Sequence, residues 1–150
     1  MADRICKERR SQNMAAIRGK NTEPELYLRK LLFNHGYRYR INVKNVPGHP
    51  DLYLAKYNAT VFINGCFWHR HKNCKLAYVP KSRVEFWERK FSANVHRDGT
   101  VRELLQQNGI RQLVIWECTI KKMKRSENEK NEILKQIEEF LHSDERFREI

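Results

Sequence analysis

Apolar residues recur at helical spacing in the first strongly patterned stretch of the chain. Helix-like spacing is shown by Leu26, Tyr27, Leu28, Leu31 and Leu32. The preceding Thr22-Glu23-Pro24-Glu25 matches a capping box, and Gly36 is a typical stop signal. Together these signals predict a helix over residues 23–35.

After this helix the period of the apolar pattern changes to two. Apolar and polar residues alternate over 37–43, which predicts a half-buried strand. Pro47-Gly48-His49-Pro50 then interrupts the pattern. Two apolar runs follow, at 51–55 and 59–63, and they predict a hairpin whose turn is 56–58.

Helix signals return in the second half of the chain. Ser82-Arg83-Val84-Glu85 is a second capping box, and we expect a helix from there to about residue 97. Gly99 predicts a kink, Thr100-Val101-Arg102-Glu103 is a third capping signal, and Gly109 predicts a stop.

The fold class follows from the order of these elements. The apolar run 112–117 predicts a central strand, and the amphipathic pattern over 127–142 predicts a closing helix. Helices and strands in this order indicate an α/β protein with a mixed central sheet flanked by helices. We divide the chain into a basic arm, 1–20, and one domain, 21–150.

The net charge of the chain indicates a class of binding partner. The chain has 30 Lys and Arg against 18 Asp and Glu, a net charge of +12 and a pI near 9.8. This excess favours a polyanionic partner, with nucleic acid first; a solvated basic surface or a structural binder is the alternative. No run of 18 apolar residues and no signal-peptide pattern is present, so we expect a cytoplasmic protein without membrane insertion.

Cysteine and histidine spacing points to a metal. Cys66, His71 and Cys74 lie close together in one loop, and Cys118 follows the predicted central strand. Four S and N ligands make a closed tetrahedral set that suits structural zinc. The alternative is buried free cysteines with a surface histidine. Cys6, in the arm, is left out of this set.

His69 and Asp51 are the candidates for chemistry. A histidine held on a rigid loop titrates near neutral pH and suits general-base work on water, although alone it reads as a surface residue. Asp51 begins the hairpin whose second strand leads to His69, and a carboxylate there could bind Mg²⁺. A turn-forming role is the alternative for Asp51. Glu25 is a weaker candidate, because capping explains it.

Adjacent aromatics suggest contact with bases. Phe67 and Trp68 cannot both face one core, so at least one is expected to be exposed, where it could stack on bases or wedge between them. A satellite core under the zinc loop is the alternative. Trp87 lies on the next helix, either in the core or facing the DNA. Three polar side chains share its helical face: Lys90, Asn94 and Arg97.

These residues resemble a known family, the very-short-patch repair (Vsr) endonucleases. The similarity covers roughly 10–120, in matching order and spacing. It rests on Arg10-Ser11-Gln12-Asn13-Met14, Pro47-Gly48-His49-Pro50-Asp51, Val61-Phe62-Ile63-Asn64-Gly65-Cys66-Phe67-Trp68-His69, Glu85-Phe86-Trp87, Asn94-Val95-His96-Arg97-Asp98 and Val114-Ile115-Trp116-Glu117-Cys118. The resemblance implies a restriction-endonuclease-like fold and a Mg²⁺-dependent nick 5′ of the thymine in T:G mismatches, which arise when 5-methylcytosine deaminates.

The resemblance also implies catalytic roles. Asp51 would bind Mg²⁺ with help from the backbone carbonyl of Ile63, His69 would be the general base, and Glu25 a supporting acid. The Cys/His set would hold structural zinc. Two departures from the family pattern stand out: Asn64 replaces a histidine, and the zinc loop has one extra residue before its second cysteine.

The DNA-binding roles are implied in the same way. Phe67, Trp68 and Trp87 would intercalate from the major groove, and Met14 would enter from the minor-groove side. Lys90 and Asn94 would contact the mispair. The partners implied are duplex DNA with a T:G mismatch and, functionally, a cytosine-5 DNA methyltransferase. We expect a monomer, because one nick requires only one active site. We expect it in the cytoplasm of a prokaryote, associated with the nucleoid.

Two other functions stay open at this stage. One is a related nicking or restriction nuclease that cuts matched, sequence-specific DNA. The other is a zinc-stabilised DNA-binding module without catalysis.

Overall fold

The computed structural model describes residues 21–150. Its strands are β1 (Leu52–Leu54), β2 (Ala59–Asn64), β3 (Arg111–Trp116) and β4 (Phe147–Glu149). Its helices are α2 (Glu23–Asn34), the short 3-10 helix η1 (Ala55–Tyr57), α3 (Val84–Gln107), α4 (Glu117–Arg125) and α5 (Glu127–Leu141). The strands form one sheet in the order β1-β2-β3-β4. β1 pairs antiparallel with β2, and the other two pairs are parallel, so the sheet is mixed.

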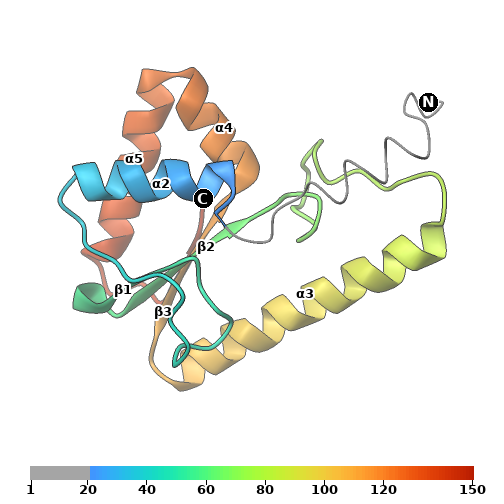
Figure 1. Cartoon of the computed structure of the whole chain (residues 1–150), viewed down its shortest axis with the longest axis horizontal. Helices are drawn as coiled ribbons and strands as arrows, with labels where there is room; N and C mark the ends of the chain where they lie inside the picture. The colour runs from blue at the N-terminus through green and yellow to red at the C-terminus, as the bar shows by residue number, and fades with distance from the viewer. Residues whose placement is uncertain (1–20) are drawn as a thin grey trace.

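Helices α2, α4 and α5 pack together over one face of the sheet (Figure 1). Alternate side chains of β2 and β3 point to this face, because successive residues of a strand face opposite sides. Val61, Leu113 and Ile115 are therefore buried among the helices. The helical residues that are fully or almost fully buried there include Leu28, Leu32, Ile120, Met123, Ile137 and Phe140.

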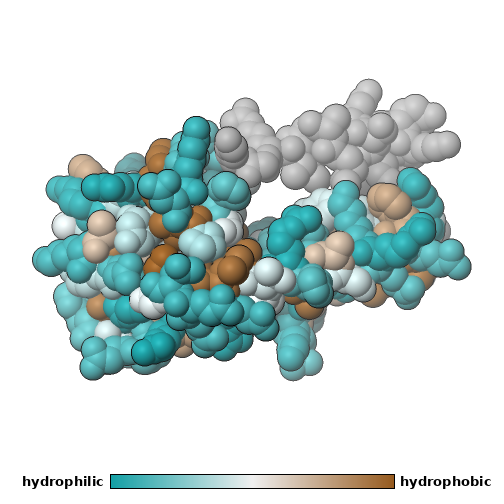
Figure 2. All heavy atoms as spheres, turned by 90° about the horizontal axis from the view of Figure 1, so that it is seen from below, coloured by the Kyte–Doolittle hydropathy of each residue, from teal (hydrophilic) through white to brown (hydrophobic). Residues whose placement is uncertain are grey.

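The other face of the sheet is covered differently. Phe62, Val114 and Trp116 point to this side and pack with Cys66 and Cys74 from the loop after β2. Helix α3 contacts β3 near its C-terminal end, and its N-terminal part lies beyond the sheet (Figure 1). Seen from below, the molecule has a larger body, which contains the sheet, and a narrower projection, to which the first half of α3 and the neighbouring loop extend (Figures 1 and 2).

Most of the predicted elements are present. The first helix, the hairpin over 51–63, the central strand and the closing helix all form near their predicted bounds. Asn58 supplies the left-handed turn of the hairpin with φ 48°. The expected mixed sheet with flanking helices is confirmed. The arm 1–20 lies outside the described residues.

The strand predicted over 37–43 is wrong. Only a single bridge forms there, between Arg40 and Tyr53. Asn42 has φ 56°, which ends the extended backbone, and Ile41 is 43% exposed. The alternation was real, but the segment runs along the edge of the hairpin and does not pair along its length.

The kink predicted at Gly99 and the new helix start at Thr100 are also wrong. Helix α3 continues through both residues for 24 residues in all. A glycine inside a helix costs only about 1 kcal/mol relative to alanine. Phe91 and Leu105, buried on either side of Gly99, anchor both halves of α3, so packing outweighs that cost.

The ends of some elements differ from the sequence signals. Ser82 does not cap α3: the N-cap is Arg83, with φ 53° and no capping side chain. Helix α4 was not predicted, because its only buried side chains are Thr119, Ile120 and Met123 among many lysines. Strand β4 was missed too, since three residues are too few to show a period.

Candidate active site and metal centre

The loop after β2 and the start of α4 meet at a Cys/His cluster. β2 and β3 run parallel with Asn64 opposite Trp116, so the residues two positions further on, Cys66 and Cys118, lie side by side. His71 and Cys74 complete the cluster, in which the four ligand atoms lie within 4.8 Å of one another. The structure thus brings together the four residues of the predicted set, which could hold a metal ion.

His71 is well placed to act as a ligand in this cluster. Its Nδ1 atom lies 3.5 Å from the Sγ atom of Cys66 and 3.4 Å from that of Cys118. Its ring stacks on Trp116 with centroids 4.2 Å apart. Burial lowers the pKa of His71 and so favours the neutral imidazole that metal binding requires, and burial raises the pKa of the Cys66 thiol.

Asp51 lies just before β1, beside the end of β2. Its Oδ2 atom accepts a hydrogen bond from the backbone N–H of Ile63 at 2.7 Å. Burial raises the pKa of Asp51 to about 6, and the nearby Glu25 adds to this rise, while the Ile63 hydrogen bond, Arg29 and His69 oppose it. Asp51 therefore lies close enough to Glu25, Arg29 and His69 for their charges to affect its pKa.

The turn before Asp51 is held against α3. Gly48 has φ +83°, and a Cβ atom there would lie 2.3 Å from Cγ1 of Val101. Only glycine allows both this backbone conformation and this close approach. The predicted turn residues thus fix the start of the hairpin, and with it Asp51.

Glu25 is buried, with 7% exposure, and its carboxylate is already bonded. It accepts hydrogen bonds from the Thr22 hydroxyl and the Asn21 backbone N–H, each at 3.0 Å. Arg29 adds an ion pair at 3.2 Å. The capping box expected here is modified, since the Thr22 side chain bonds the Glu25 carboxylate and makes no cap to the helix backbone.

His69 is paired with a residue that the sequence did not assign. Its Nδ1 atom lies 2.7 Å from Oδ2 of Asp98, on α3. Asn94, one turn earlier on the same helix, donates to the backbone carbonyl of Trp68 at 3.1 Å. The spacing of four between Asn94 and Asp98 would have revealed this shared face if α3 had not been expected to end near residue 97.

Phe67, Trp68 and Trp87 pack with one another. Phe67 lies at the centre of the group, with its ring centroid 5.1 Å from Trp68 and 5.4 Å from Trp87. All three rings are half-buried. Lys90 lies over the Trp68 ring at 5.4 Å. The cluster thus combines both expectations for these aromatics: the rings pack together as a small core, and each residue stays partly exposed.

Two further candidates for DNA binding remain. Arg97 is exposed on α3, beside Asp98 in sequence. Met14 lies outside the described residues, so its expected role has no structural counterpart.

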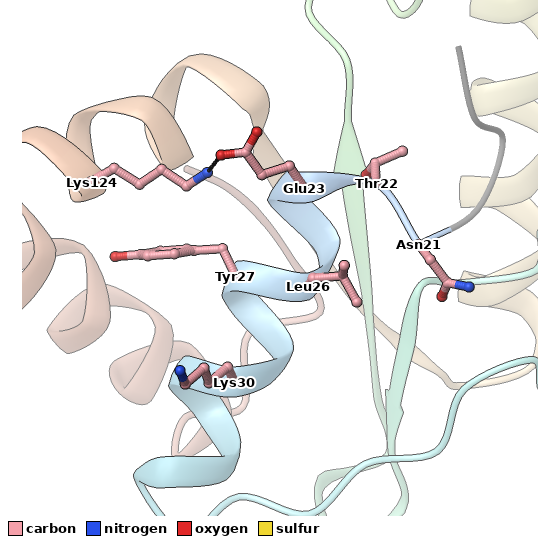
Figure 3. Close-up of a pocket in the computed structure, with 7 residues that line it drawn as sticks. All are labelled: Asn21, Thr22, Glu23, Leu26, Tyr27, Lys30 and Lys124. Atoms are coloured by element: carbon pink, nitrogen blue, oxygen red, sulfur yellow. Dashed lines mark hydrogen bonds and ion pairs between the residues drawn. The ribbon is translucent and has the colours of Figure 1, made fainter. Parts of the chain in front are cut away.

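A hollow elsewhere on the surface does not belong to this site. It lies between the first turns of α2 and the end of α4, where Lys124 pairs with Glu23 beside Tyr27 (Figure 3). None of the candidate catalytic or ligand residues lines it.

Within the described residues, no helix combines the length and apolar character that a membrane span requires.

Comparison with known proteins shows which family this chain is similar to. The family model described as DNA mismatch endonuclease Vsr matches residues 2–76. The type II nicking enzyme V.NmeAIP of Neisseria meningitidis serogroup A is 38% identical over 139 residues, which cover 93% of this chain and 99% of that protein.

Two further relatives have similar identity. The type II nicking enzyme V.XorIIP of Xanthomonas oryzae pv. oryzae is 41% identical over 120 residues, 80% of this chain and 88% of the relative. The DNA mismatch endonuclease Vsr of Escherichia coli K12 is 41% identical over 121 residues, 81% of this chain and 77% of the relative. The chain therefore belongs to the family of the DNA mismatch endonuclease Vsr and is a DNA endonuclease.

Proposed function

We propose that this protein is a strand-specific mismatch endonuclease that nicks DNA 5′ of the thymine in T:G mismatches left by deamination of 5-methylcytosine. Membership of the family supports the substrate. The observation that carries the mechanism is the pairing of His69 with Asp98 beside Asp51. This arrangement supplies a base and a carboxylate ligand at one place.

His69 is the general base in this mechanism. Asp98 holds its Nδ1 atom, which leaves Nε2 to accept a proton from the attacking water. The carboxylate also stabilises the imidazolium ion that results. Hydrolysis of the phosphodiester then proceeds by in-line attack of that water.

Asp51 and the backbone carbonyl of Ile63 would hold Mg²⁺. In a strand, the N–H and C=O of one residue point to the same side, and the N–H of Ile63 already reaches Asp51. A half-buried carboxylate with a second acid, Glu25, nearby suits a divalent cation. When bound, Mg²⁺ supplies charge stabilisation to the scissile phosphate. Glu25 is the supporting acid, acting on Asp51 through its charge.

The aromatic cluster recognises the mismatch. Phe67, Trp68 and Trp87 intercalate from the major groove, and each ring exchanges contact with its neighbours for contact with a base. A T:G pair is already loosened, so unstacking costs less there than in a matched duplex. Met14 enters from the minor groove. Lys90 and Asn94 contact the mispair, and Arg97 a phosphate.

Zinc is the metal that suits the Cys/His cluster. Zn–S distances of about 2.3 Å and Zn–N distances of about 2.0 Å in a tetrahedron place sulfur and nitrogen ligands about 3.5 Å apart. The Sγ to Nδ1 distances of 3.5 and 3.4 Å agree with that spacing. Four protein ligands leave no open position, so this zinc would be structural.

The remaining expectations complete the proposal. We assign the mixed sheet to the restriction-endonuclease-like fold. The protein acts as a monomer in the cytoplasm of a prokaryote, at the nucleoid, and serves sites modified by a cytosine-5 DNA methyltransferase.

One experiment tests the proposed substrate directly. Nicking is measured with Mg²⁺ on two duplexes of one sequence, one with a T:G pair and one with C:G at the same position. We expect a cut on the thymine strand of the T:G duplex alone. The relatives that are type II nicking enzymes favour a second candidate, a nuclease for matched DNA. Equal cutting of both duplexes would support that candidate and exclude ours.

A further inference from the structure

A long part of the chain beside the active site carries positive charge without any acid. No Asp or Glu occurs between Asp51 and Glu85. The loop that leads from the Cys/His cluster to α3, residues 72–83, contains three exposed lysines and an exposed arginine: Lys72, Lys75, Lys81 and Arg83. We call this loop the 72–83 segment. Its side chains form none of the ion pairs found among the described residues.

Two apolar side chains stand out of the middle of this segment. Tyr78 is 64% exposed and Val79 is 54% exposed, more than any other large hydrophobic residue described. The ring of Tyr78 lies 5.0 Å from that of Phe67, so it extends the aromatic cluster towards solvent. An exposed tyrosine between two lysines, each three residues away, suits a surface that is both charged and aromatic.

The segment is held in place although it has no regular secondary structure. Arg70 donates to the carbonyls of Phe67 and Tyr78 at 3.1 Å and to that of Ala77 at 2.8 Å. Its guanidinium also lies 3.9 Å from the centroid of the Phe91 ring on α3. These contacts tie Tyr78 to the aromatic cluster, so a ligand that binds there orders little additional chain.

We infer that the 72–83 segment is a second DNA-contacting surface, in which Tyr78 packs against a nucleotide next to the intercalated step while Lys75 and Lys81 neutralise phosphates on either side. This inference rests on the proposed function. The positive charge, which has no ion-pair partner within residues 21–150, and the continuity with Phe67 favour duplex DNA as the occupant. An acidic protein would need no aromatic ring placed beside the intercalating ones.

The test measures binding of a fluorescent duplex by anisotropy, without Mg²⁺ so that no cleavage occurs, over a range of salt concentrations. For the Lys75→Ala, Lys81→Ala double variant we expect weaker binding and a salt slope reduced by about 2, because each lysine releases about one counterion. Lys56→Ala, Lys135→Ala, which removes two exposed lysines elsewhere, is the matched control and should leave the slope unchanged.

Tyrosine variants test the ring itself. Tyr78→Ala should weaken binding about tenfold, the usual scale of one aromatic contact with a base, whereas Tyr78→Phe should keep most of the affinity. Phe33→Ala removes a 52% exposed ring on α2 and is the control. If Tyr78→Ala and the double lysine variant bind like the unaltered protein, the inference is overturned, even where T:G nicking persists. If both lose affinity on a duplex that is not nicked selectively, the surface stands and the T:G assignment falls.

Discussion

The Nδ1 atom of His69 lies 2.7 Å from Oδ2 of Asp98, which joins the loop after β2 to the middle of α3. A neutral imidazole carries its proton on one nitrogen, and a carboxylate beside Nδ1 selects the tautomer with the proton there. The lone pair of Nε2 then remains free for a proton from water. In the proposed mechanism, Asp98 thus orients His69 and favours the tautomer whose Nε2 accepts the proton.

Replacement of Asp98 by asparagine should slow nicking without preventing binding. The amide cannot stabilise an imidazolium ion, so we expect the single-turnover rate to fall about 10- to 100-fold, part of the usual contribution of a general base. Affinity for the duplex, measured without Mg²⁺, should change little. Glu88→Gln, at an exposed position of the same helix, is the control. A rate equal to that of the unaltered protein would exclude Asp98 from the mechanism.

Asp51→Ala should abolish nicking of a T:G duplex while leaving DNA binding intact. The carboxylate is the proposed Mg²⁺ ligand and does not belong to the aromatic cluster that we propose for mismatch recognition. Nicking on a gel and binding by anisotropy separate the two effects. Full activity of the variant at saturating Mg²⁺ would contradict the proposed metal site.

The raised pKa of Asp51 predicts a pH-dependent stability. Burial raises this pKa from 3.8 to about 6, so protonated Asp51 favours the folded protein, and that contribution is lost as pH rises through 6. Asp51→Asn should therefore stabilise the Mg²⁺-free protein more at pH 7.5 than at pH 4.5, by roughly 2 kcal/mol. Denaturant unfolding at the two pH values measures the difference.

A control separates this effect from general charge removal. Asp144→Asn, at an exposed position, should show no such pH dependence. If the stability difference between Asp51→Asn and the unaltered protein is the same at both pH values, burial does not raise the pKa of Asp51.

The Cys/His cluster predicts a loss of metal when one ligand is removed. Cys118→Ser should lower the zinc content of the purified protein and its thermal stability, because the proposed zinc would link the loop after β2 to α4. Elemental analysis and a melting curve are the measurements. Cys6→Ser, which alters a cysteine that the sequence leaves out of the predicted ligand set, should keep the metal. Retention of full zinc content and stability by Cys118→Ser would refute the four-ligand assignment.

Local sequence patterns predicted much of the fold, and they failed where contacts from elsewhere in the chain decided. The hairpin and the central strand form because their apolar periods match buried faces of the sheet. Gly99 predicted a kink, but Phe91 and Leu105 anchor α3 on both sides of it, and the helix is continuous. The tyrosine-rich alternation over 37–43 predicted a strand, but the segment forms a β-bridge at one residue only.

The sequence by itself determined which residue types are available: the Cys/His spacing, the adjacent aromatics and the carboxylate after the turn are local features that short-range chemistry explains. Only the tertiary structure decided which of them meet. The parallel register of β2 and β3 brings Cys118 to Cys66, and the unbroken course of α3 brings Asp98 to His69. Such long-range pairings depend on how sheet and helix pack around one core, and no local period carries that information.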